Sequence, residues 1–139
     1  MIIGGIKESS ASDEIYSLVG NSWTRRGTLG TKRRLHACTA LGKYLYIVGG
    51  TSANAKLATT EILDMETWEV QSGPDLPWQA SSCQAVSHNG TVYVIGGHGK
   101  VIKLDKSTNT WTNIPNMKVS PKLRQVFPPQ LVGNKIVDF

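Results

Sequence analysis

The sequence of 139 residues contains no apolar run near the ~18 residues that a membrane-spanning helix needs. Its apolar start, Met1-Ile2-Ile3, is too short for the core of a signal peptide, and no charged segment precedes it. Aromatic residues make up only 7% of the chain and charged residues 18%, a balance typical of a folded, moderately polar globular protein. We therefore expect a folded chain that makes no membrane contact.

Cysteine and histidine are both scarce. The two cysteines, Cys38 and Cys83, lie at matching places of the repeat described below, which favours buried thiols in a reduced, cytoplasmic setting and leaves a disulfide as the alternative. The three histidines are scattered, no pair of them has metal-ligand spacing, and no Cys-His motif is present. The sequence therefore predicts no metal site and no cofactor.

The chain has only a modest excess of positive charge, a net charge of +5 with an isoelectric point near 9.4. Dedicated nucleic-acid binders are more basic than this. The most basic stretch, residues 24–34, also lacks the interleaved aromatic residues on which bases stack. Nucleic-acid binding is therefore a minor alternative, to be recognised by a steep loss of affinity with salt.

Three glycine pairs recur along the chain, each directly after a short apolar run. Successive pairs are 45 residues apart (4 to 49) and 47 residues apart (49 to 96). A period of this size indicates an array of one supersecondary unit. The pairs are Gly4-Gly5, Gly49-Gly50 and Gly96-Gly97.

A tryptophan follows each glycine pair at a similar distance. Trp23 and Trp68 lie 18 residues after the second glycine of their pairs, and Trp111 lies 14 residues after Gly97. A period-two stretch typical of a half-buried strand precedes each tryptophan, and no helical periodicity occurs. Each unit is predicted to contain four strands, A to D, with Tyr46 or Tyr93 in strand B before the glycines. Four-stranded units repeated radially are propeller blades.

This order of residues resembles the kelch repeat, and the resemblance covers essentially the whole chain. It is carried by Tyr46-Ile-Val-Gly-Gly, followed by Glu61-Ile-Leu-Asp and Trp68, and by the corresponding residues around Tyr93. The last unit departs from the pattern. Val137 replaces the strand-B tyrosine, Asp138 stands at an apolar position, and Pro128-Pro129 falls inside the expected innermost strand. The resemblance implies an all-β kelch-type propeller of antiparallel four-stranded blades.

The chain is expected to be a single kelch array of about three blades' worth of strands. We expect residues 1–32 to form the second half of a blade, 33–79 and 80–122 to form two blades, and 123–139 to form the first half of another. Propellers typically close with ~4–8 blades, so this array is open unless another chain completes it. Three interpretations remain: a piece of a larger propeller, a partner carrying the missing half, or two copies forming a six-bladed ring.

The candidate binding residues lie in the expected D–A connection of the first blade, residues 24–34. Planar guanidinium groups bind carboxylates bidentately, so this basic segment predicts a docking patch for an acidic peptide, whereas a solvated loop is the alternative. The kelch resemblance implies that arginines 16 residues before the glycine pair line the ligand face, as Arg33 does before Gly49 and Arg124 does before position 140. Trp78 is expected at the same place in the middle blade, or else packed between blades. The basic residues are Arg25, Arg26, Lys32, Arg33 and Arg34.

The sequence thus predicts a non-catalytic module that binds a protein partner with an acidic segment. The resemblance implies a substrate-recognition or scaffold role, as in ubiquitin-ligase adaptors or actin-associated kelch proteins. Sugar-processing or oxidase-type kelch enzymes are the alternative. Arg33→Ala or Arg124→Ala is expected to weaken binding with little loss of stability.

Overall fold

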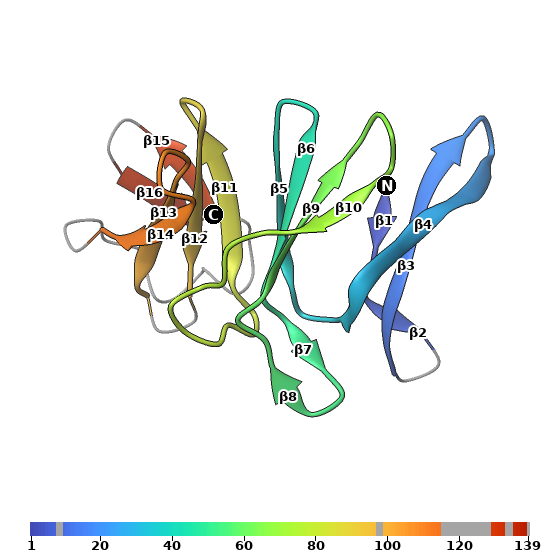
Figure 1. Ribbon diagram of the computed structural model, residues 1–139, viewed down its shortest axis with the longest axis horizontal. Helices are drawn as coiled ribbons and strands as arrows, with labels where there is room; N and C mark the ends of the chain where they lie inside the picture. The colour runs from blue at the N-terminus through green and yellow to red at the C-terminus, as the bar shows by residue number, and fades with distance from the viewer. Residues whose placement is uncertain (8–9, 97–98, 115–128, 133–134, 139) are drawn as a thin grey trace.

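The computed structural model describes residues 1–7, 10–96, 99–114, 129–132 and 135–138, and every regular element among them is a β-strand. Three antiparallel four-stranded sheets stand side by side, as Figure 1 shows. The predicted all-β fold of open, four-stranded antiparallel sheets is therefore confirmed. Nothing in the described part of the chain forms a helix that could cross a membrane.

The first sheet is built around one long hairpin. Its strands β3 (Ser10–Val19) and β4 (Ser22–Arg33) pair along most of their length, with register shifts between Ser12 and Glu14 and between Ile15 and Tyr16. Two short strands, β1 (Ile2–Ile3) and β2 (Ile6–Lys7), pair with β3 one after the other. Ile3 is the register partner of Ile15, so β1 occupies the place of strand B in this sheet.

The second and third sheets repeat one order of strands. The second sheet contains β5 (Ala37–Leu41), β6 (Tyr44–Val48), β9 (Thr60–Asp64) and β10 (Val70–Ser72), paired in that order. The third sheet contains β11 (Gln84–His88), β12 (Thr91–Ile95), β13 (Val101–Asp105) and β14 (Thr110–Asn113). Two further hairpins are β7 (Thr51–Ser52) with β8 (Ala55–Lys56), and β15 (Pro129–Val132) with β16 (Lys135–Asp138).

The hydrophobic core lies between neighbouring sheets rather than within one sheet. Ile15 and Leu29 of the first sheet pack with Ile47 and Leu63 of the second. A second cluster joins the second and third sheets, where the innermost strands β5 and β11 contact each other. This cluster consists of Ala37, Val48, Leu76, Ala80, Cys83, Val94 and Ile102. Each sheet therefore depends on its neighbour for burial of its apolar face.

The expectation that residues 24–34 form a loop is wrong, because β4 continues to Arg33. Strand β3 pairs with the first part of this stretch, as far as Thr28, and again with Arg33, and two glycines let the strand pass close to the second sheet. A Cβ on Gly30 would lie 3.0 Å from Glu61 Oε1, and one on Gly27 would lie 3.7 Å from the Trp68 carbonyl oxygen. The basic stretch is therefore mostly strand.

The second glycine of a pair forms a backbone hydrogen bond with the segment that precedes the innermost strand of the next sheet. The Gly5 amide donates to the Arg33 carbonyl at 2.7 Å, and the Gly50 amide donates to the Ala80 carbonyl at 2.6 Å. Ala80 is therefore the structural counterpart of Arg33, and the alignment of Trp78 with Arg33 is wrong. Trp78 is half-buried against the core between the second and third sheets.

Candidate functional site

A groove runs between the innermost strands β5 and β11 at the ends where these strands begin. It has a volume of about 360 Å³. Its walls are two segments of equal length, Leu35–Cys38 and Ser82–Ala85. Leu35 is 54% exposed, which makes it the main apolar side chain that this groove offers to solvent. The groove is the candidate functional site.

The two walls are equivalent positions of the repeat and are joined through the backbone. Leu35 and Ser82 both have a φ of 56°, a left-handed conformation that is uncommon for residues other than glycine. The Ser82 amide donates to the Leu35 carbonyl at 2.9 Å. This bond fixes one wall against the other, so the groove is formed before any partner arrives.

Two of the predicted basic residues come just before Leu35 in the chain. Lys32 is exposed near the end of β4, and Arg34 is half-buried, with its amide bonded to the Thr51 carbonyl at 3.0 Å. Leu35 was not a candidate from the sequence. Its position two residues after Arg33 indicated that it lies at the same end of the sheet as the predicted site. A leucine in the sequence does not predict the left-handed backbone that this residue adopts.

Arg25 and Arg26 lie away from the groove, on opposite faces of β4. The Arg25 guanidinium is 3.8 Å from the Glu14 carboxylate. The Arg26 guanidinium lies 5.2 Å from the centroid of the Trp68 ring and donates to the Ser17 hydroxyl at 2.8 Å. Neither side chain extends the basic surface beside Leu35.

Arg33 is fully buried, which contradicts the prediction that it lines a ligand surface. Its Nε donates to Glu61 Oε2 at 2.9 Å, and its two terminal nitrogens donate to the Gly49 carbonyl and to the carbonyl and hydroxyl of Thr59. The other Glu61 oxygen, Oε1, accepts from the Gly30 amide. Arg33 and Glu61 thus connect the first sheet to the second. Arg124, the equivalent predicted in the last unit, lies outside the described residues.

The groove contains two thiols, and both are held in the protonated form. Burial raises the pKa of Cys83 to about 11. Part of Cys38 is exposed, but the groove walls remove water from its thiol and raise its pKa to about 12. A protonated thiol is a poor nucleophile. In the described ranges, no three His, Cys, Asp or Glu side chains gather as a metal site would require. The two thiols of the groove are therefore poorly suited to nucleophilic attack.

His36 forms part of the groove wall and is held neutral. Burial lowers its pKa below the usual value, with a smaller effect in the same direction from the positive charge of Arg33, while a bond to the Ile3 backbone opposes both. Its Nδ1 has no hydrogen-bond partner among the described residues. Protonating this imidazole would place a positive charge next to buried Arg33.

We therefore expect His36 to make the protein less stable in mild acid. A histidine with a lowered folded pKa contributes stability above its unfolded value of about 6.5, and this contribution is lost as the pH falls toward the folded pKa. Urea unfolding of wild type and His36→Gln at about pH 7.5 and about pH 5.5 tests this. The loss of stability on acidification should be smaller in the variant. An equal loss in both proteins would contradict the assignment to His36.

Comparison with known proteins places this geometry in a family. Residues 32–77 and 80–118 match the Kelch motif. An F-box/kelch-repeat protein of Arabidopsis thaliana is 30% identical over 131 residues, covering 84% of this chain and 31% of the relative. A second F-box/kelch-repeat protein of that plant is 32% identical over 97 residues, covering 69% of this chain and 26% of the relative.

A viral protein shows the same likeness. Kelch repeat protein C2 of vaccinia virus is 26% identical over 126 residues, covering 86% of this chain and 23% of the relative. The chain therefore spans about a third or less of the length of these relatives. The motif matches cover more than half of the chain, and they coincide with the second and third sheets. The chain belongs to the kelch-repeat family.

Proposed function

We propose that this chain is a non-catalytic protein-interaction module that binds an extended segment of a partner protein in the groove between β5 and β11. The observation that carries the proposal is the exposed Leu35, which lies at the groove directly after two basic residues of its own segment, Lys32 and Arg34. Arginine is enriched in interaction hot spots, so Arg34 and the apolar side chain that follows it offer a partner both a charged and an apolar contact.

The partner segment is expected to be acidic. Lys32 and Arg34 precede Leu35. Exposed Lys56 is carried by the β7–β8 hairpin, whose first residue, Thr51, is the backbone partner of Arg34. Carboxylates of the partner would pair with these cations while an apolar side chain contacts Leu35. Since Lys32 and Lys56 are solvent-exposed, the affinity should fall as salt is raised.

The role that fits this module is substrate recognition or scaffolding within a larger assembly. Its relatives named F-box/kelch-repeat proteins support a place in ubiquitin-ligase adaptors. The protonated thiols of the groove support binding without catalysis.

Leu35→Asn is expected to weaken partner binding at least about tenfold, with little change in stability. Asparagine tolerates the left-handed backbone of this position, so the substitution removes the apolar side chain and keeps the chain path. Proteins captured by the immobilised chain would be identified by mass spectrometry. The bound segment would then be titrated as a labelled peptide by fluorescence polarisation.

Ala53→Asn is the matched control, because Ala53 has nearly the same φ, 54°, is exposed, and is not part of the groove walls. It should bind the peptide as wild type does. Peptide affinity that is unchanged in Leu35→Asn and insensitive to salt would overturn the proposed site.

A further inference from the structure

Two of the three repeat tryptophans lie between sheets. Trp68 precedes β10 of the second sheet and packs with Ile15 and Leu29 of the first. Trp111, in β14 of the third sheet, packs in a cluster with Tyr46 of the second sheet, and its Nε1 donates to the Pro74 carbonyl at 2.9 Å. Each tryptophan therefore covers the face of the preceding sheet.

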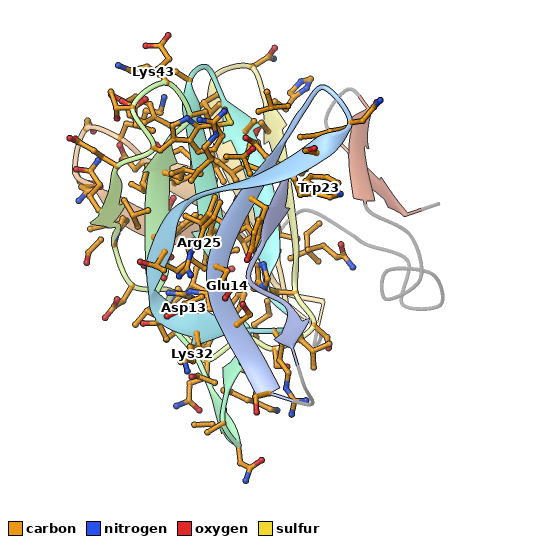
Figure 2. All side chains as sticks on the ribbon, turned by 90° about the vertical axis from the view of Figure 1, so that its right-hand side faces the viewer. Asp13, Glu14, Trp23, Arg25, Lys32 and Lys43 are labelled. Atoms are coloured by element: carbon orange, nitrogen blue, oxygen red, sulfur yellow. The ribbon has the colours of Figure 1, made fainter. Side chains whose placement is uncertain are left out.

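Trp23 occupies the same position in the first sheet but has no such cover. Ile15 is fully buried toward the second sheet, so alternate residues of this hairpin face the opposite way. Trp23 is 51% exposed and Leu18, its register partner, is 55% exposed. Figure 2 shows Trp23 and Arg25 on the face that is turned away from the second sheet. We call this the outer face of the first sheet; it carries Glu14, Tyr16, Leu18, Trp23 and Arg25.

The face of the third sheet that is turned away from the second sheet resembles the face of the second sheet that Trp111 covers. Val92 and Leu104 of this sheet are buried in the cluster that contains Tyr46, so the side chains that alternate with them face away from the second sheet. These are two pairs of register partners, Tyr93 with Lys103 and Ile95 with Val101. Ile95 and Val101 are only 1% exposed and β15 contacts β11, so this chain already covers that end of the face. The end that remains carries Tyr93 and Lys103, which correspond to the register partners Tyr46 and Ile62 of the second sheet.

Lys103, the cation on this face of the third sheet, has a counterpart in Arg26 of the first sheet. Arg26 of the first sheet lies 5.2 Å from the centroid of the Trp68 ring, so the sheet that is covered supplies a positive charge to the tryptophan that covers it. Lys103 is exposed and lies next to Tyr93 on the face of the third sheet that is turned away from the second sheet. It can make the same contact with an incoming indole.

We propose that the outer face of the first sheet binds the third sheet of a second copy of this chain, with the Trp23 indole packed on Tyr93 and Lys103. Each copy carries both surfaces, and a two-fold axis would make the two contacts identical and close the pair. The groove between β5 and β11 takes no part in this contact, so the proposal is independent of the proposed function.

The test measures the mass of the chain by size-exclusion chromatography with light scattering over a range of concentrations. Wild type is expected to dimerise. Trp23→Thr, which keeps a good strand former, and Lys103→Glu, at an exposed position, should each raise the dimer dissociation constant at least about tenfold. Lys56→Glu makes the same charge change on the β7–β8 hairpin and should leave the constant unchanged.

A mixture of the two variants makes the test specific. In a mixed pair, one contact combines both defects, whereas the other joins an intact Trp23 to an intact Lys103. Equimolar Trp23→Thr and Lys103→Glu should therefore form more dimer than either variant alone. A wild type that remains monomeric at the highest concentration would overturn the proposal, and so would a dimer whose dissociation constant in both variants is unchanged from wild type.

Discussion

Arg33→Met is expected to destabilise the protein by about 3–5 kcal/mol, because it removes one partner of a buried ion pair. Glu61 is only 6% exposed and would keep its charge without the guanidinium that lies 2.9 Å away. The Gly49 carbonyl would lose its guanidinium donor at 2.8 Å. The Thr59 carbonyl would lose the donor at 2.9 Å and keep only the Gly49 amide at 3.1 Å. Since the pair connects the first sheet to the second, the loss should reduce the cooperativity of unfolding as well as the midpoint.

Urea unfolding followed by circular dichroism measures this change, with Arg25→Met as the matched control. The Arg25 side chain is 52% exposed and its ion pair with Glu14 is 3.8 Å long, so its removal should cost at most about 1 kcal/mol. Arg33→Lys should be intermediate, because the charge stays while the planar fork is lost. If Arg33→Met unfolds at the same urea concentration as Arg25→Met, the guanidinium does not support the fold.

This result would also separate two explanations for any loss of partner binding. The sequence led us to expect weaker binding and unchanged stability for an Arg33 variant. The buried position of Arg33 reverses that order: stability is lost first, and binding is lost because the groove walls move. Leu35→Asn, which leaves the backbone in place, is the variant that reports on binding itself.

The fold was predictable from the sequence because its signals are local and repeated. Period-two alternation, a glycine pair and a tryptophan recur at nearly constant spacing, and each is a direct consequence of strand geometry or close backbone approach. The long first hairpin was missed for a physical reason. Residues 24–34 contain arginine and glycine in the proportions of a loop, and they are kept extended by pairing with β3 and by the bridge from Arg34 to Thr51.

The site was less predictable, since it depends on the direction of side chains. Spacing from Gly49 located Arg33 at the correct end of its sheet, but could not tell that its guanidinium turns inward to Glu61, 28 residues further along the chain. The same spacing placed Trp78 at the position that Ala80 holds, because only the hydrogen bond from Gly50 shows which residue meets the glycine pair.

Gly49→Ala is expected to have the second large effect on stability. Gly49 has a φ of +63°, and a Cβ there would collide with the backbone carbonyl oxygen of Ala80. The neighbouring amide, that of Gly50, donates to the same oxygen at 2.6 Å. The Gly49-Gly50 segment and the Ala80 segment therefore cannot move apart without losing this hydrogen bond. We expect a loss of about 1–2 kcal/mol from the left-handed backbone and a further loss of about 2 kcal/mol from the collision.

Gly42→Ala separates these two contributions. Gly42 has nearly the same φ, +61°, but a Cβ there would meet nothing within 4 Å. Unfolding of the two variants in urea should therefore differ by the collision alone. Equal destabilisation of both would show that the Ala80 segment moves aside freely. A larger loss in Gly49→Ala would show that this segment is held in place, and since Ala80 leads directly into the groove wall at Ser82, only Gly49→Ala should also weaken peptide binding.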